Sequence, residues 1–351
     1  QKKLQNSSGQ KGVLEQTITS GSWCPEFQTE INKSKHELPI RGGYVLDLKT
    51  GKSRLRTPSD LFSFELGVSN RGAVDEAARA DAEKFFLSLF CGDEDLGKYF
   101  LDILGYVLTG ETEARLLWVV YGNGRNGKST VMELLRDMMK GYYTNLSESA
   151  LIDHGNGGGP TPELMSMATA RFGIVSETKE GSRLDAKRVK SLTGNEAFRA
   201  RQLYQNEITI EPCTKIALLT NHKPLFDATD KAMTDRIRLL PFNAVFEATK
   251  ENTEFVNSLR RPACMDEIFR MMVDAAKEYY ARGCQMLPQP TAAAAATAAM
   301  THELDTVGAF LKNSCVDGTP GCPTCDMFDK YTEYCEETNN PPLSKNKFHK
   351  T

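Results

Sequence analysis

The sequence lacks any long apolar run, any secretory start and any large net charge. Its 351 residues are 40% hydrophobic and 25% charged, and the formal net charge is −3. A membrane-spanning helix needs about 20 apolar residues in a row, and a signal peptide needs a basic start followed by an apolar segment. We therefore expect no membrane partner. The small negative charge excludes a global attraction to nucleic acid, so any DNA contact must come from a local basic surface.

Patterns for metal binding and disulfide bonding are also scarce. The five histidines are dispersed and have no zinc-ligand spacing. Most of the nine cysteines lie far apart, which is typical of an intracellular, reducing compartment. The exception is the group Cys315, Cys322, Cys325 and Cys335. Its CxxC motif permits a structural zinc, but a second CxxC is missing, and Cys335 falls in a helix-like stretch where a buried thiol is common.

Composition and periodicity divide the chain into five segments. The chain begins with Gln1 rather than Met, so we expect a fragment of a longer protein. An alanine-rich run at 291–300 has high helix propensity and predicts a bridging helix. The predicted segments are a linker with a small β element (1–75), a helical collar (76–112), a nucleotide-binding core (113–245), C-terminal helices (246–300) and a truncated helical unit (301–351).

Local patterns predict the main elements of these segments. Two short apolar runs around residues 49–52 predict a hairpin. Apolar residues at spacings of three and four on either side of residues 92–93 predict two amphipathic helices. Continuous apolar runs at 114–121, 172–176 and 215–220 are typical of strands buried on both faces of a parallel sheet. Because these strands alternate with helical segments, the sequence predicts an α/β fold.

The stretch YGNGRNGKST, residues 121–130, fits two phosphate-binding patterns. One is the GxGxxG of dinucleotide sites, and the other is the GxxxxGKS of triphosphate-binding P-loops. Lys128 can reach the β and γ oxygens of a triphosphate, and the Ser129 hydroxyl can coordinate Mg²⁺. A dinucleotide site needs an acidic residue at a strand end about 20 positions on, and Asp153 follows no long strand. The stretch therefore predicts a P-loop for ATP and Mg²⁺. The residues expected at the nucleotide are Gly122, Asn123, Gly124, Arg125, Asn126, Gly127, Lys128, Ser129 and Thr130.

ATP hydrolysis needs polar groups beyond this loop. Glu177 follows the apolar run at 172–176, and we expect it to orient water and, with Ser129, to hold Mg²⁺; the alternative is an exposed strand-end carboxylate. Asn221 follows the next run and is expected to sense the γ-phosphate, unless it only forms a turn. Arg236 and Arg238 alternate along a further strand. One of them can serve as an arginine finger to a neighbouring subunit, and the alternative is a pair of solvated arginines.

The segment between the apolar runs at 172–176 and 215–220 is locally basic. Residues 183–201 hold six basic side chains against two acidic ones. The alternating stretches FRARQLY and EITIE on either side of residues 205–206 predict a hairpin. One interpretation is a contact surface for DNA or for intersubunit phosphate, and the other is a solvated helix followed by an ordinary hairpin. The candidate contact residues are Lys187, Lys190, Arg199 and Arg201.

Together these motifs resemble the superfamily III helicase module of the helicase-primases of large DNA viruses, phages and plasmids. The resemblance runs from about residue 38 to the end of the chain. LPIRGGYVLDLKTG resembles the N-terminal segment of that module, YGNGRNGKST its Walker A motif and IVSET its Walker B motif. LLTNHKP resembles its motif C, DRIRLLPF its arginine-finger strand, and FDKYTEYCEETNNPPLSKNKF the start of its winged-helix unit.

This resemblance implies an AAA+-type core in a homo-hexameric ring that hydrolyses ATP between subunits and moves along single-stranded DNA. It gives Arg236 the finger role and places the hairpin in the central channel. Tyr204 is then at the tip of the hairpin, where an aromatic ring can stack on bases. An upstream primase domain and replication in the host cytoplasm are also implied. From the residues alone, a small-molecule P-loop kinase and a nucleotide-gated assembly protein stay open, although the chain shows no acceptor-site base for a kinase.

Overall fold

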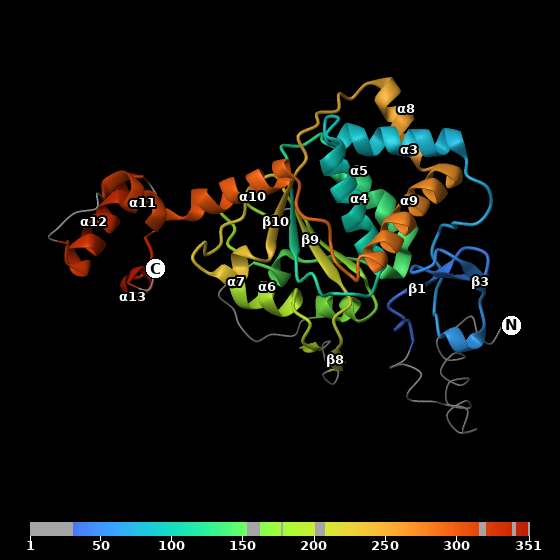
Figure 1. Cartoon of the computed structure of the whole chain (residues 1–351), viewed down its shortest axis with the longest axis horizontal. Coiled ribbons are helices and arrows are strands. Elements are labelled where there is room, and N and C mark those ends of the chain that lie inside the picture. The colour runs from blue at the N-terminus through green and yellow to red at the C-terminus, as the bar shows by residue number, and fades with distance from the viewer. Residues whose placement is uncertain are drawn as a thin grey trace.

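A five-stranded, all-parallel sheet forms the centre of the computed structural model, with helices on both faces (Figure 1). The strand order is β10-β4-β9-β6-β5. The predicted α/β fold with a parallel sheet is therefore confirmed. The strands are β4 (Leu117–Tyr121), β5 (Tyr143–Leu146), β6 (Phe172–Ser176), β9 (Lys215–Thr220) and β10 (Ile237–Pro241). The structure describes residues 31–152, 162–176, 178–200, 208–315, 321–338 and 342–349.

The order of these strands brings three predicted strands together. β4, β6 and β9 lie within or match the predicted apolar runs, and their side chains are almost all buried. β9 lies between β4 and β6, so polar residues that follow the three strands meet at one edge of the sheet. The prediction missed β5, because its sequence YTNL has no apolar run; β5 is an edge strand with only its last residue buried.

Four helices and the sheet share one apolar cluster on the first face. The two predicted amphipathic helices are confirmed, and the carboxylates of Asp75 and Asp93 cap their first turns. Phe90 and Phe100 of this pair pack edge-to-face on Phe242, which follows β10, with ring centroids 5.1 and 5.5 Å away. The pair thus packs directly on the sheet, and its role as a collar stays a prediction. The helices of this face are α3 (Glu76–Leu89), α4 (Glu94–Leu108), α5 (Lys128–Met139) and α9 (Pro262–Ala281).

A second apolar cluster covers the other face of the sheet. The alanine-rich run forms a helix there, as predicted, and this helix lies along the edge strand β10. Thr297 Oγ1 accepts the Leu239 N–H at 2.9 Å, which satisfies a backbone donor that an open sheet edge would expose. The helices of this face are α6 (Ala186–Leu192), α7 (Lys231–Thr234), α10 (Thr291–Leu304) and the 3-10 turns η4 (Glu148–Ala150) and η5 (Pro162–Ala168).

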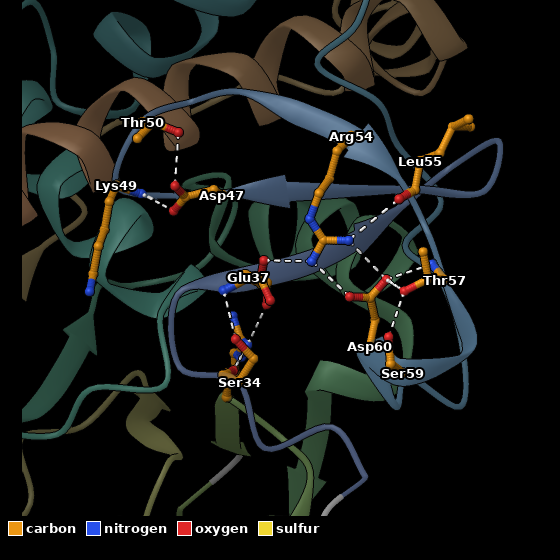
Figure 2. Close-up of polar contacts among 11 residues, drawn as sticks. Ser34, Glu37, Asp47, Lys49, Thr50, Arg54, Leu55, Thr57, Ser59 and Asp60 are labelled. Atoms are coloured by element: carbon orange, nitrogen blue, oxygen red, sulfur yellow. Dashed lines mark hydrogen bonds and ion pairs between the residues drawn. The ribbon is translucent and has the colours of Figure 1, made fainter.

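A small antiparallel sheet precedes these elements. Its strands are β1 (Glu37–Ile40), β2 (Tyr44–Asp47) and β3 (Ser53–Leu55), and the β2-β3 turn confirms the predicted hairpin. Figure 2 shows the Arg54 guanidinium between two carboxylates. It donates twice to Asp60, at 2.7 and 2.9 Å, and once to Glu37, at 2.9 Å. Asp60 ends the 3-10 turn η2 (Pro58–Asp60), so these bonds hold that turn against the small sheet.

Arg171 joins the small sheet to the core. It directly precedes β6 and is only 1% exposed. Its guanidinium donates to the carbonyls of Leu108 at the end of α4 and of Ser34, and at 2.9 Å to that of Glu37. The last carbonyls of a helix have no partner within it. The buried cation therefore satisfies a helix end and the chain that leads into β1 at the same time.

The remaining elements lie around this core. The predicted hairpin is present as β7 (Phe198–Ala200) and β8 (Ile208–Ile210). The last three helices form a separate small apolar cluster, reached through α10 (Figure 1). Its winged-helix character stays a prediction. The other helical elements are η3 (Lys140–Tyr142), α8 (Lys250–Leu259), α11 (Thr306–Ser314), α12 (Thr324–Glu337) and α13 (Lys345–Phe348).

The C-terminal cysteines give the zinc interpretation no support. Cys335 is buried in the small cluster, as a structural thiol would be, while Cys322 and Cys325 are exposed. Within the described residues, no group of three His, Cys, Asp or Glu side chains is placed to hold a metal ion. Over the same ranges, no helix combines the length and the apolar character that a membrane crossing needs.

Candidate functional site

The glycine loop connects β4 to α5 and has little freedom in its backbone. Gly124, Arg125 and Gly127 have φ values of 93°, 50° and 81°, the left-handed region that favours glycine. A Cβ at Gly122 would collide with the Asn126 amide and a backbone carbonyl, and one at Gly127 would lie 2.5 Å from Leu89. Backbone N–H groups in such a turn, where left-handed residues follow right-handed ones, can form an anion-binding nest.

Contacts from the chain that follows β10 fix the shape of this loop. Asn126 Nδ2 donates to the carbonyl of Phe242 at 3.2 Å. The Phe246 N–H donates to the carbonyl of Arg125 at 2.7 Å. Asn126 was expected to touch the nucleotide, but it is buried and its side chain braces the loop. The predicted loop residues therefore have two roles: some face the cavity, and Asn126 holds the loop in shape. No pattern in the sequence indicated that residues 242–246 contact the loop.

Lys128 and Asn221 meet at this loop although 93 positions separate them. Lys128 Nζ donates to Asn221 Oδ1 at 3.1 Å and to the Gly122 carbonyl at 2.5 Å. The lysine is only 7% exposed, and burial lowers its pKa. Two residues predicted separately for phosphate binding and γ-phosphate sensing thus lie in direct contact, because β4 and β9 are neighbours in the sheet.

A polar cavity of about 360 Å³ opens beside this pair. Ser129 is exposed at its wall, as a ligand for Mg²⁺ must be. Glu177 lies outside the described residues, but its neighbours Ser176 and Thr178 both line the cavity. Hydroxyl and carboxylate oxygens are the ligands that Mg²⁺ prefers. Sequence reasoning gave no site role to four of the polar lining residues, Thr178, Lys179, Thr220 and His222, which lie at or just beyond the ends of β6 and β9.

A second cavity, of about 470 Å³, is lined by other residues of the loop. Arg125, Gly127 and Thr130 of the loop form one wall. The rings of Phe85, Phe246 and Phe255 also line it, so this cavity is more aromatic than the first. These rings come from α3, from the chain after β10 and from α8. Residues of the glycine loop and of the first turn of α5 therefore line both a polar cavity and an aromatic one.

Arg236 lies at the edge formed by the amino ends of the strands, whereas the glycine loop lies at the edge formed by their carboxyl ends. Its carbonyl accepts the Leu117 N–H at the start of β4, whereas the loop follows the end of that five-residue strand. The two edges are about 16 Å apart at 3.3 Å per residue. Arg236 Nη1 donates to the Ala232 carbonyl at 2.7 Å, and its Nε is buried without a hydrogen-bond partner among the described residues. Arg238 donates to the carbonyls of Ile237 and Thr234.

The predicted DNA-contacting residues are only partly described. Tyr204 and Arg201 lie outside the described residues. Arg199 is on β7, opposite Thr209 of β8. Lys190 Nζ forms an ion pair with Asp230 at 2.5 Å, so its charge already has a partner within the chain. Lys187 is exposed on α6.

Comparison with known proteins adds two family matches and several relatives. A family model described as "Family of unknown function (DUF5906)" matches residues 120–236, which include the glycine loop, Asn221 and Arg236. A second, described as "Poxvirus D5 protein-like", matches residues 302–351. A protein of Acanthamoeba polyphaga mimivirus named "Putative helicase" is 27% identical over 71% of this chain and 26% of its own length. "Primase D5" of fowlpox virus is 30% identical over 42% of this chain and 19% of its own.

These matches support a relationship to the helicase-primase family of large DNA viruses. Another relative, a "Putative helicase" of Invertebrate iridescent virus 3, is 28% identical over 72% of the chain and 27% of its own length. The chain spans about a quarter of the length of the mimivirus and iridescent virus proteins. Its fold is similar to that of the C-terminal region of NrS-1, with a TM-score of 0.52 and 14% identity over 78% of this chain and 64% of that one.

Proposed function

We propose that this chain is the ATP-hydrolysing motor of a replicative DNA helicase. The observation that carries the proposal is the contact of Lys128 with Asn221, because it places a phosphate-binding cation and a polar sensor on one cavity. Helicase and primase names among the viral relatives support the same activity. A fold similar to NrS-1 is consistent with the proposed AAA+-type P-loop core.

In this proposal the loop divides ATP between the two cavities. The β- and γ-phosphates lie at Lys128, and Mg²⁺ is held by Ser129 with Glu177. The base enters the aromatic cavity, where Phe246 and Phe255 offer ring faces for stacking. Lys128 then exchanges the Gly122 carbonyl for phosphate oxygens, and Asn221 orients the attacking water. Binding of the anion also compensates for the burial that lowers the lysine pKa.

The position of Arg236 supports catalysis between subunits. An arginine at the far edge of the sheet cannot reach the phosphates of its own chain, whereas it can reach those of a neighbour in a ring. We therefore propose a homo-hexamer in which Arg236 is the finger, released from the Ala232 carbonyl when the neighbour binds ATP. The β7-β8 hairpin, with Arg199, Arg201 and Tyr204, contacts single-stranded DNA in the channel. A covalently linked primase domain completes the proposed protein.

The decisive experiment measures ATP hydrolysis and forked-duplex unwinding by the purified protein, with and without single-stranded DNA. We expect hydrolysis that single-stranded DNA stimulates, and we expect Lys128→Ala to abolish both activities. Lys98→Ala, which removes an exposed lysine on α4, is the matched control. Unwinding by Lys128→Ala at the wild-type rate would overturn the proposal. Ring assembly with negligible turnover would favour a nucleotide-gated assembly protein, and phosphorylation of a small molecule without a DNA effect would favour a kinase.

A further inference from the structure

Two threonine hydroxyls join the ends of β6 and β9 at the polar cavity. The strands are parallel neighbours, with Ser176 opposite Leu219. Thr178, just beyond β6, donates its hydroxyl to Thr220 Oγ1, in the last residue of β9, at 2.9 Å. The two residues are 7% and 3% exposed, so the bond is shielded from water. Both line the cavity that contains Lys128 and Ser129.

The Thr220 hydroxyl uses its whole hydrogen-bonding capacity in this arrangement. A hydroxyl has one proton to donate and two lone pairs to accept with. Thr220 donates to the carbonyl of His222 at 2.7 Å and accepts the His222 N–H at 3.0 Å. Thr178 fills the second lone pair. The side chain therefore closes the backbone turn that starts at the end of β9 and fixes it to β6.

Asn221 is the central residue of this closed turn. It is exposed to the cavity, and its Oδ1 accepts the Lys128 ammonium at 3.1 Å. An exposed asparagine at a strand end has several rotamers and backbone conformations open to it, unless the turn holds its main chain. The three hydrogen bonds of Thr220 supply that restraint. The position of the Asn221 amide thus depends on a hydroxyl pair that, among the described residues, forms no hydrogen bond with the side chain of Lys128 or Asn221.

We propose that Thr178 and Thr220 are positioning residues that hold the Asn221 amide against Lys128. This inference rests on the proposed ATPase function. Thr178 has a single bond in this network, so its loss frees the turn from β6 without removing the turn itself. Misplacement of a polar group by a fraction of an ångström lowers the rate of the chemical step more than it lowers substrate binding. The pair therefore acts on kcat rather than on nucleotide affinity.

The kinetic test compares Thr178→Val with Thr178→Ser. Valine keeps the shape and removes the hydroxyl, and we expect kcat for ATP to fall about tenfold while KM changes less than about twofold. Serine restores the hydroxyl and most of kcat. Thr144→Val removes a similar hydroxyl pair, Thr144 with Ser166 at 2.7 Å, far from the loop, and is expected to leave kcat unchanged. An unchanged kcat in Thr178→Val, or a failure of serine to restore it, overturns the proposal.

A double variant separates positioning from a direct role. If Thr178 acts through Asn221, Thr178→Val combined with Asn221→Ala has the same kcat as Asn221→Ala alone. If kcat of the double variant instead falls by the product of the two single-variant losses, the proposal is contradicted. A readout independent of turnover is the side-chain amide NMR signal of Asn221, which should move in Thr178→Val and stay in place in Thr144→Val. If the wild type hydrolyses no ATP, the proposed function fails, and an unmoved Asn221 signal still overturns the positioning role separately.

Discussion

The ammonium of Lys128 lies 3.1 Å from Oδ1 of Asn221, at the point where two neighbouring strands of a parallel sheet end. An amide oxygen is a neutral acceptor, so it holds the lysine without cancelling its charge. The cation is therefore available to bind a phosphate. Once the phosphate has replaced the amide as the partner of the lysine, the amide is available to bind a water. This relationship gives a direct prediction for the asparagine.

We expect Asn221→Asp to impair ATP hydrolysis more than Asn221→Ala does. A carboxylate would form an ion pair with Lys128 and repel the γ-phosphate, whereas alanine only removes the sensor. Loss of one polar group that stabilises the transition state costs on the order of 100-fold in kcat. Steady-state hydrolysis by the purified variants measures the difference. Asn145→Asp, on the edge strand β5, is the control for the same chemical change elsewhere in the sheet. Equal rates for both Asn221 variants would contradict the predicted ion pair.

Mixing of two inactive variants tests whether Arg236 acts on a neighbouring subunit. Arg236→Ala leaves the glycine loop intact, and Lys128→Ala leaves the finger intact, because the two residues lie at opposite edges of the sheet. In a mixed ring, a subunit with an intact loop can meet a neighbour with an intact finger. We expect the mixture to hydrolyse ATP faster than either variant alone. The same mixing experiment with Arg238→Ala in place of Arg236→Ala shows which of the two arginines is the finger. No gain in any mixture would mean that Arg236 serves its own chain or only caps α7.

The aromatic cavity predicts an effect on nucleotide affinity rather than on turnover. Phe255→Ala removes one ring face from the cavity beside Arg125 and Thr130. Stacking of a base on an aromatic side chain contributes about 1–3 kcal/mol, so we expect the Kd for ATP to rise about tenfold with little change in kcat. Titration with a fluorescent ATP analogue measures this change. Leu87→Ala, at an exposed position on α3, is expected to bind normally. Unchanged affinity in Phe255→Ala would place the base elsewhere.

The ion pairs of the small N-terminal sheet predict a contribution to stability that acid removes. The Arg54 guanidinium lowers the pKa of Asp60 to about 2 from its usual 3.8 (Figure 2). Because the folded-state pKa is below the unfolded value, the stabilisation is present above pH 4 and is lost as the pH falls from about 4 to about 2. Arg54 is 48% exposed, so solvent screening keeps the effect small.

An NMR titration of the Asp60 carboxyl tests this prediction. We expect its pKa to rise towards the ordinary value in Arg54→Met, since methionine fills similar space without the charge. Arg79→Met, which removes an i,i+4 pair with Glu83 on α3, is expected to leave the Asp60 titration unchanged. An Asp60 pKa near 4 in the wild type would show that Arg54 does not hold the carboxylate in solution.

The sequence predicted those parts of the fold whose signal is local. Three central strands were found because burial on both faces makes each a continuous apolar run. β5 was missed because an edge strand with one buried residue needs no such run. The glycine loop was recognised because the backbone conformation and the phosphate chemistry require specific residues at a fixed spacing. Asn126 was assigned to the nucleotide, and its contact with the Phe242 carbonyl 116 positions away could not be foreseen.

The sequence by itself thus determined the identity and order of the chemical groups: a loop with its lysine and serine, then Glu177 and Asn221 after successive apolar runs, and Arg236 at the start of a further strand. Only the tertiary structure decided which of them meet, because strand order in a sheet is set by packing between segments that are remote in the chain. It put Asn221 against Lys128, joined Thr178 to Thr220, and left Arg236 at the far edge. The tertiary structure also brought α3 and α8 together to form the aromatic cavity. The apolar residues of each helix indicate from the sequence only that the helix has a buried face, not which element covers it.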